Sequence, residues 1–417
     1  MPTDHATRYQ QLLETQPELK KFDHTLKIAV ALHDTGVKHD VILRQLNDGV
    51  SDFWIPMRKD HYPRRLSPSQ ESLFERAQTE LLTKDLEVGH PWPSEHFNLG
   101  QDSIDEDNKM PRSLKYRKTL STGSGPRPTI IQEVTTPSGD LYVLKRIRRR
   151  HTYEEELEEM KYIKGELSIM KKMRYVSLPH FVRLVASYTE INYVGLLLHP
   201  RAECHLGEFL DKSHQEPDVH LLSTFFGCIA TALAYLHCND SVRHKDIKPE
   251  NILVKGTRVL LTDFGISLDF SATNITTTNE EKRRSLKYCA PEVAASEPRN
   301  SSSDIWSLGC VFLEMTAVLK GKKRKDIHNI LARHGQPNFC HSRRGIEDAV
   351  EWLREENSQY EKPLGWIKEM IPWAAEKRIT ARALQDRIFH DGREYSGMCC
   401  FKKNLTEFDP PEQVRVS

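Results

Sequence analysis

The spacing of apolar residues changes along the chain and divides it into an N-terminal region, a strand-rich region and a helical region. In the first, residues 26–46 combine helix formers with apolar clusters and are broken by Asp-Thr-Gly, which indicates one or two amphipathic helices. A further helix is marked by Ser67 and Gln70, a capping box with proline at the first helical position. Its expected buried face contains Leu73, Phe74, Ala77 and Leu81. The polar, acidic residues 89–112 are expected to form a connector.

From residue 113 the pattern becomes that of β-strands. Five runs predict strands, at residues 118–122, 129–134, 141–147, 182–188 and 193–198. The second and third are joined by Thr-Thr-Pro-Ser-Gly-Asp, which favours a turn, so the sheet is expected to be antiparallel. After the third, Thr152 and Glu155 form a capping box. A long amphipathic helix should follow, because apolar residues then repeat at intervals of three and four, at Leu157, Met160, Ile163, Leu167 and Met170.

Glu166 lies on the apolar side of this helix, three residues after Ile163 and four before Met170. Its carboxylate is therefore expected to point inward and to need a partner. The alternative, a helix-edge glutamate in solvent, is favoured by helical spacing alone.

The second half of the chain is predominantly helical. LLSTFFGCIATALAYLH is apolar nearly all round, which is typical of a buried helix, and further helical segments follow Glu292. A sheet-rich lobe followed by a helical lobe predicts an α+β fold with a cleft between the lobes.

Composition narrows the classes of partner. The chain of 417 residues carries 60 Lys and Arg against 59 Asp and Glu, so no net field indicates nucleic acid or a membrane as the partner. The first residues lack a signal peptide, and no stretch approaches the roughly 18 apolar residues of a membrane span. We therefore expect a soluble intracellular protein, cytoplasmic or nuclear.

The eight cysteines are scattered, without the paired CxxC spacing of a zinc site or the density of a disulfide scaffold. We expect reduced thiols, most of them buried. The adjacent Cys399 and Cys400 could carry a lipid, but no membrane signal accompanies them.

The stretch VRHKDIKPENILV, residues 242–254, places Asp246, Lys248 and Asn251 close together in a loop of the expected cleft. The loop follows the buried helix and precedes two short strands, which should form a hairpin at Lys255-Gly256. On its own, this segment would be read as a solvated charged turn.

Two further motifs change that interpretation: DFG at residues 263–265 and APE at residues 290–292 follow HKDIKPEN in order. With DIWSLG at residues 304–309 and Arg378, the chain resembles the eukaryotic protein kinase family, serine/threonine type, over about residues 113–392. The resemblance implies a two-lobed α+β fold, with a five-stranded antiparallel N-lobe carrying one main helix and a mainly helical C-lobe. We expect three parts: a helical extension and connector (1–112), the kinase domain (113–395) and a C-terminal tail (396–417).

The resemblance also implies use of ATP and Mg²⁺ to phosphorylate protein Ser/Thr hydroxyls. It assigns Asp246 as the acceptor of the substrate hydroxyl proton and Lys248 as the lysine that steadies the transferring phosphate. Asn251 and Asp263 match the metal-binding positions, with the hard oxygen ligands that Mg²⁺ prefers. Lys145 matches the strand lysine that holds the α- and β-phosphates, and Glu166 matches its partner on the following helix.

The same alignment predicts the residues around the nucleotide. Leu198 would guard the back of the adenine pocket, and the backbone of His199 and Arg201 would contact adenine, which tolerates Pro200 between them. The remaining expected contacts are Gly123, Gly125, Ile130, Val143 and Leu253.

Three features depart from the family pattern. The phosphate-covering loop lacks one glycine in either register, with Gly123, Gly125 and Pro128 or with Ser121, Gly123 and Pro126 in the glycine positions. Val143 replaces a smaller alanine, and Lys245 replaces an arginine before the catalytic aspartate. The glycine-poor loop leaves a catalytically weak or inactive pseudokinase scaffold as the alternative function. A small-molecule phosphotransferase is disfavoured by the APE segment and the long activation loop.

Hydroxyl residues between DFG and APE, at Ser271, Thr273, Thr276–Thr278 and Ser285, suggest activation by another kinase or by autophosphorylation in residues 271–285. A polar surface loop is the plain alternative. The role of residues 1–112 stays open between docking on the kinase unit, recruiting partners and blocking the cleft.

Overall fold

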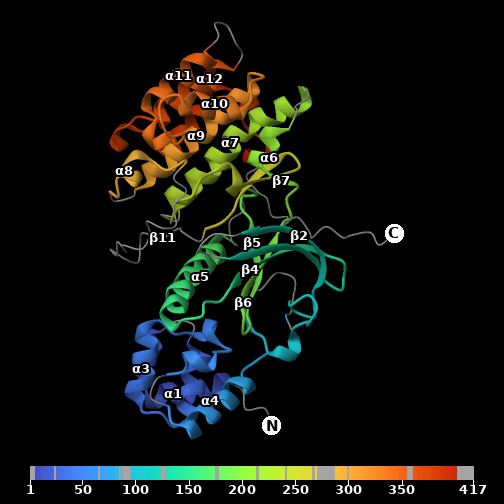
Figure 1. Ribbon diagram of the computed structural model, residues 1–417, viewed down its shortest axis with the longest axis vertical. Helices are drawn as coiled ribbons and strands as arrows, with labels where there is room; N and C mark the ends of the chain where they lie inside the picture. Colours follow the sequence, from blue (N-terminus) through green and yellow to red (C-terminus); the bar gives the residue numbers. More distant parts are fainter. Residues whose placement is uncertain are drawn as a thin grey trace. The chain divides into compact units, whose positions relative to one another are not determined.

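The computed structural model of the chain (Figure 1) describes residues 5–22, 25–63, 66–83, 86, 95–123, 128–173, 178–212, 216–239, 242–264, 268–269, 287–297, 300–354 and 360–401. These residues divide into two compact units. The first contains residues up to 171 together with residues 183–201, and the second contains residues 172–182 and those from 202 to 401.

A six-stranded sheet forms the centre of the first unit, in the order β1-β5-β6-β4-β3-β2. Its strands are β1 (His96–Asn98), β2 (Lys115–Gly123), β3 (Thr129–Thr135), β4 (Leu141–Arg148), β5 (Arg183–Thr189) and β6 (Tyr193–His199). The expected five strands are all present and antiparallel to their neighbours. The sixth strand, β1, pairs in parallel with β5 and was not predicted. Three residues are too few to show strand periodicity, so this part of the sequence was assigned to the connector.

One long helix, α5 (Tyr153–Met173), follows β4 as predicted. One of the two bonds of the expected capping box is observed: the backbone N–H of Glu155 donates to Oγ1 of Thr152 at 3.3 Å. The residues of the predicted face are buried except for the half-buried Leu157. The opposite face of the sheet packs a second apolar cluster, in which Tyr142 and Leu144 of β4 meet residues of the connector such as Phe97 and Leu99.

Four helices make up most of the N-terminal region: α1 (His5–Thr15), α2 (Leu26–Asp34), α3 (His39–Asp48) and α4 (Pro68–Glu80). The break between α2 and α3 at the Asp-Thr-Gly turn is confirmed, and so is the capping box of Ser67 and Gln70. Helix α1 was not predicted. Leu73, expected in the core, is 48% exposed, because the buried face of α4 runs through Phe74 and Ala77 to Leu81 instead.

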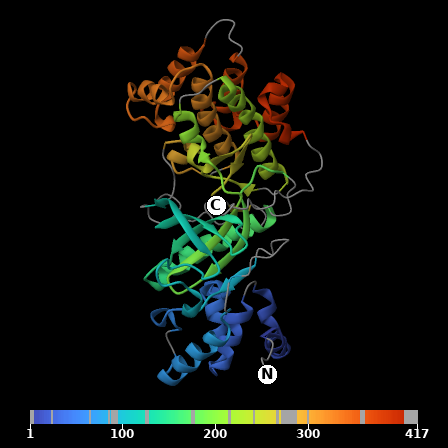
Figure 2. The same cartoon turned by 90° about the vertical axis from the view of Figure 1, so that its right-hand side faces the viewer.

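The N-terminal region docks onto the sheet and α5 within one unit (Figures 1 and 2). Asn98 of β1 donates from Nδ2 to the backbone carbonyls of Asp52 and Ile55, both at 2.7 Å. The Thr189 hydroxyl at the end of β5 donates to the carbonyl of Phe53 at 2.9 Å. Of the three roles left open for residues 1–112, docking on the sheet-bearing unit is therefore observed.

The second unit is mainly helical. Its helices are α6 (Leu206–Asp211), α7 (Glu216–Asn239), α8 (Pro291–Ala294), α9 (Ser301–Leu319), α10 (Arg324–Ala332), α11 (Arg343–Leu353), α12 (Glu361–Met370) and α13 (Ala381–Asp391). By length and composition, α7 and α9 could each cross a membrane, so the expectation that no segment approaches this apolarity was wrong. However, 72% and 94% of their apolar windows are buried inside the protein, as in the core helices of globular domains.

Short strands complete the second unit. β7 (Cys204–His205), β9 (Ile252–Lys255) and β10 (Arg258–Leu261) form a three-stranded sheet, and β8 (Val242–Arg243) pairs with β11 (Leu268–Asp269). The predicted hairpin between β9 and β10 is confirmed, with Gly256 at φ +55° in its turn. These strands hold both ends of the loop that contains Asp246.

Candidate active site

The first unit brings Lys145 and Glu166 together. Lys145 on β4 donates from Nζ to Oε1 of Glu166 on α5 at 2.7 Å, and the two side chains are only 14% and 2% exposed. Because exposure is low, solvent screens this charge-assisted bond weakly. Glu166 thus points inward, as predicted, and the alternative of a helix-edge glutamate is wrong.

The residues expected around adenine lie on the same sheet. Val143 of β4 and Leu198 of β6 are direct cross-strand partners, so their side chains are neighbours. Val143 and Ile130 are half-buried, whereas Leu198 and His199 are buried. Arg201 donates from Nε to Oε2 of Glu133 at 2.9 Å.

The phosphate-covering loop is described at its edges. Gly123 is the last residue of β2 and pairs with Thr129 of β3. Gly125 and Pro126 lie outside the described residues. The two alternative registers of the glycine positions therefore stay open.

In the second unit, three polar side chains of the catalytic loop form one hydrogen-bonded group. Oδ2 of Asp246 accepts from Nζ of Lys248 at 2.6 Å and from Nδ2 of Asn251 at 3.0 Å. Nδ2 of Asn251 also donates to the backbone carbonyl of Asp246 at 2.9 Å. Since both of these bonds use the amide nitrogen, the amide oxygen of Asn251 remains as a ligand atom for a cation.

A buried carboxylate, Asp304 of α9, holds the backbone of this loop. Its two oxygens accept from the backbone N–H groups of His244 at 2.9 Å and Lys245 at 2.8 Å, and Oδ2 also contacts Nε2 of His237 at 2.9 Å. Burial raises the pKa of Asp304, but the bond to His237 and the other donors outweigh it and hold that pKa below its ordinary value. Lys245 has φ +65°, a costly conformation for a residue with a side chain. Asp304 was not predicted as a site residue, although the DIWSLG motif contains it.

Asp263 is positioned by hydrogen bonds between its own segment and the catalytic loop. Nε2 of His244 contacts the carbonyl of Thr262 at 3.0 Å, and the Thr262 N–H donates to the carbonyl of Asn251 at 3.1 Å. Asp263 itself has φ +65°, and the next residue, Phe264, is buried with its ring 5.3 Å from that of His244. The two predicted metal-binding positions are therefore on directly bonded segments. Leu253 is half-buried on β9.

The APE motif is tied to the helical unit by a bidentate ion pair. Arg378 donates from Nη1 and Nη2 to the two carboxylate oxygens of Glu292 at 2.7 and 2.8 Å. The guanidinium is buried and also donates to three backbone carbonyls, of Ser302, Pro372 and Trp373. This geometry fixes the segment through several charge-assisted bonds. The hydroxyl residues at 271–285, by contrast, lie outside the described residues.

Comparison with known proteins gives a family for most of the chain. A family model described as "Protein kinase domain" matches residues 116–389.

Human "3-phosphoinositide-dependent protein kinase 1" is 27% identical over 215 residues, which are 51% of this chain and 36% of that protein. "cAMP-dependent protein kinase type 3" of Saccharomyces cerevisiae is 29% identical over 231 residues, 54% of each chain. Mouse "Ribosomal protein S6 kinase alpha-2" is 26% identical over 292 residues, 67% of this chain and 36% of that protein. The matched segments thus span between about a third and about half of these relatives' lengths.

Proposed function

This chain belongs to the eukaryotic protein kinase family, serine/threonine type, and from that membership we propose that it transfers the γ-phosphate of ATP to Ser or Thr hydroxyls of protein substrates. The observation that carries the proposal is the hydrogen-bonded group of Asp246, Lys248 and Asn251. In this group one carboxylate oxygen of Asp246 accepts from both the ammonium of Lys248 and the amide of Asn251. Phosphoryl transfer needs such groups, because its catalysis consists mainly of positioning and charge stabilisation.

The charged residues of the candidate active site have separate roles in the proposed reaction. Asp246 accepts the proton of the substrate hydroxyl, and Lys248, which donates a hydrogen bond to Asp246, offers its positive charge to the transferring phosphate. Lys145 offers a second positive charge to the α- and β-phosphates, and Glu166 fixes its direction. Asp304 keeps the loop backbone in place, so it acts as a positioning residue.

The residues fit a bound Mg²⁺. The amide oxygen of Asn251 and the carboxylate of Asp263 are hard oxygen ligands, which this cation prefers, and neither is a thiolate or imidazole that would favour a softer metal. When bound, Mg²⁺ neutralises charge on the phosphates of ATP.

The substrate class, the activation and the location of the protein are each proposed from a separate observation. Protein substrates are supported by the names of the relatives, all of them protein kinases. Phosphorylation within residues 271–285, by another kinase or by the chain itself, is supported by the hydroxyl residues of that segment. An intracellular location, cytoplasmic or nuclear, is supported by the eight cysteines, all in the described part of the chain, none of which forms a disulfide there.

A pseudokinase scaffold is the second candidate, and the glycine-poor loop at residues 123–128 favours it. Fewer glycines and more prolines leave fewer backbone N–H groups able to approach phosphate closely. Against it stand Lys145, Asp246, Asn251 and Asp263, which are all present.

Asp246→Asn tests the proposal. Transfer of radiolabelled γ-phosphate to a Ser/Thr peptide library and to the chain itself should fall by about 10²–10⁴-fold, since a general base contributes that much. Asp386→Asn, an exposed aspartate on α13, is the matched control and should retain full activity. Transfer in the Asp246 variant within a few-fold of the unmodified chain would refute the assigned role.

Thermal unfolding of the same proteins separates the two candidates. A ligand that binds only the folded state stabilises it, by about 2.7 kcal/mol at a hundred times its Kd, so Mg-ATP should raise the Tm of the unmodified chain and of both variants. No shift in any of the three proteins, together with no transfer, would favour the scaffold.

A further inference from the structure

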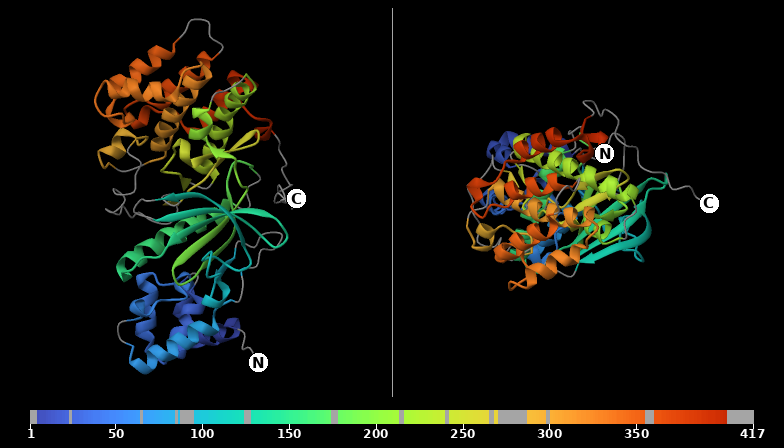
Figure 3. Two further views of the ribbon diagram at one scale, coloured as in Figure 1. Left: turned by 45° about the vertical axis from the view of Figure 1, so that its right-hand side comes forward. Right: turned by 90° about the horizontal axis from the view of Figure 1, so that it is seen from above.

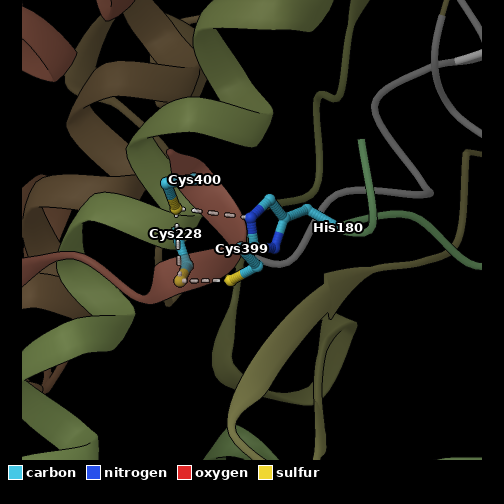
Figure 4. A group of neighbouring side chains, drawn as sticks. All are labelled: His180, Cys228, Cys399 and Cys400. Atoms are coloured by element: carbon cyan, nitrogen blue, oxygen red, sulfur yellow. Dashed lines mark hydrogen bonds between the residues drawn. The ribbon is translucent and has the colours of Figure 1, made fainter. Parts of the chain in front are cut away.

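A cluster of one histidine and three cysteines lies in the second unit and shares no residue with the candidate active site; Figure 4 shows its four side chains. His180 precedes β5, Cys228 lies on α7, and Cys399 and Cys400 belong to a short 3-10 helix, Met398–Cys400. The four potential ligand atoms all lie within 4.8 Å of one another. His180 and Cys228 are fully buried, and the other two cysteines are half-buried. Three segments that are distant in the sequence thus bring three cysteine sulfurs and one imidazole nitrogen together.

Three of the six distances between the ligand atoms match the edges of a tetrahedral zinc site, and all six are within 4.8 Å. With Zn–S bonds of about 2.3 Å and Zn–N bonds of about 2.0–2.1 Å, a tetrahedron has S···S edges of about 3.8 Å and S···N edges of about 3.5 Å. Sγ of Cys228 lies 3.7 Å from Sγ of Cys399 and 3.6 Å from Sγ of Cys400. Sγ of Cys400 lies 3.4 Å from Nε2 of His180.

The surroundings orient the ligands as in known metal sites. Nδ1 of His180 donates to the backbone carbonyl of Val259 at 2.9 Å, and this bond selects the tautomer whose Nε2 faces the sulfurs with its lone pair. Glycine at position 397 leaves space for the sulfurs of the cluster, because a Cβ there would come within 2.9 Å of Sγ of Cys399 and 3.0 Å of Sγ of Cys228.

We propose that His180, Cys228, Cys399 and Cys400 bind one Zn²⁺ as a structural site. Three thiolates and an imidazole select a soft or borderline cation such as Zn²⁺ over Mg²⁺ or Ca²⁺. Four protein ligands close the coordination shell, so no position remains for water or substrate. This site is separate from the oxygen ligands Asn251 and Asp263 and does not depend on the proposed kinase activity.

The zinc ion would cross-link the C-terminal segment to the centre of the second unit. Cys399 and Cys400 would be joined to α7 through Cys228 and to β10 through His180. The backbone carbonyl of His180 accepts from the N–H of Leu261 at 2.8 Å, and Leu261 is the last residue of β10, two positions before Asp263. The metal would therefore stabilise both the C-terminal segment and the strand that leads to Asp263.

Metal content tests the proposal directly. The full chain, purified under reducing conditions without chelators, should contain about one zinc per molecule by inductively coupled plasma mass spectrometry. After exchange with Co²⁺, the protein should show the thiolate-to-cobalt charge-transfer bands and the intense d–d bands of a tetrahedral sulfur site. Both measurements use the unmodified chain, so they do not depend on the folding of a variant.

Single substitutions assign the ligands. Cys228→Ser and Cys400→Ser should each lose most of the bound zinc, whereas Cys238→Ser, an exposed thiol on the same helix α7, should retain it. Removal of zinc with a strong chelator should lower the Tm of the unmodified chain by ~5 °C or more, and added Zn²⁺ should restore it.

Three results would overturn the proposal. The first is a folded, reduced chain that contains no zinc and takes up no Co²⁺. The second is an intact mass of the protein that shows a disulfide among the three cysteines or a lipid on Cys399 or Cys400. The third is equal zinc content in Cys228→Ser, Cys400→Ser and Cys238→Ser, which would place the metal elsewhere.

Discussion

At the scale of single residues, two aspartates show how burial and hydrogen bonding compete. Asp304 receives bonds from two backbone N–H groups and contacts His237, and these outweigh burial, so its pKa lies below the ordinary value. Asp52 follows α3 in the sequence and accepts from the backbone N–H of Ile28 in α2 at 2.9 Å. Burial nevertheless dominates and raises the pKa of Asp52 to about 6. Folding therefore favours the charged form of the Asp304 carboxyl group and disfavours the charged form of the Asp52 carboxyl group.

The raised pKa of Asp52 makes stability depend on pH. The folded state binds the proton more tightly than the unfolded state, so the stability contributed by the protonated group is complete below about pH 4 and is lost as the pH rises through about 6. Asp52→Asn keeps a hydrogen-bond acceptor for Ile28 and removes the buried charge. We expect it to stabilise the protein by about 1–3 kcal/mol above pH 6 and by little at pH 4.

Thermal unfolding at pH 4 and pH 7.5 measures this difference, with the exposed Asp386→Asn as the control. A lower Tm of Asp52→Asn at pH 7.5 would mean that the attraction between Asp52 and Lys27 outweighs burial.

At the scale of secondary-structure elements, the N-terminal region holds the beginning of α5 (Figure 3, left). Arg149, between β4 and α5, donates from Nε to the buried carboxylate of Glu156 at 2.6 Å. Its other nitrogens donate to the backbone carbonyls of Pro56 at 2.6 Å and Trp54 at 3.2 Å. One guanidinium thus joins the N-terminal region to the helix that carries Glu166.

Arg149→Ala should be strongly destabilising. It removes the closer of two guanidinium partners of Glu156, the other being Arg58 at 3.8 Å, and leaves the carbonyls of Trp54 and Pro56 without that donor, which we expect to cost about 3–5 kcal/mol. Because α5 carries Glu166, phosphotransfer should also fall. Tm and phosphotransfer measure the two effects, and Arg148→Ala, at the exposed neighbouring position, should change neither. An Arg149 variant as stable as the Arg148 variant would show that the buried pair does not join these elements.

At the scale of the whole molecule, the N-terminal region is part of the sheet-bearing unit. It adds β1 to the edge of the sheet and buries Phe53, Trp54 and Ile55. Its removal would expose the edge of β5 and apolar side chains that now lie in the core.

A chain that starts at Gly100 should therefore be less stable and less soluble than the full chain, and no more active. Tm, solubility and phosphotransfer of the two proteins, compared at equal concentration, test this expectation. Greater activity of the shortened chain would instead indicate that residues 1–99 inhibit the kinase.

Local signals were sufficient for much of the fold and for one part of the candidate site. The capping box of α4, the N-cap bond of α5, the five strands and the inward direction of Glu166 were all predicted, because each depends on residues within a few positions of one another. The grouping of Asp246, Lys248 and Asn251 was predictable for the same reason, since six positions contain all three.

Contacts between distant segments were not readable from the sequence. β1 pairs with a strand about ninety positions away, and Asp304 holds a loop that lies about sixty positions earlier in the chain. The proposed zinc ligands could not be recognised in the sequence. His180, Cys228 and the pair Cys399 and Cys400 are far apart in the chain, so their spacing follows no local metal-binding motif.

The sequence by itself determined the family, the five antiparallel strands, the long helix α5 and the chemical types in the catalytic loop, because propensity, capping and short motifs act over a few residues. Only the tertiary structure decided that the N-terminal region docks on α5, that Asp304 supports the catalytic loop and that one histidine and three cysteines converge. Such contacts depend on how elements far apart in the chain pack against one another, and no short window of sequence contains that information.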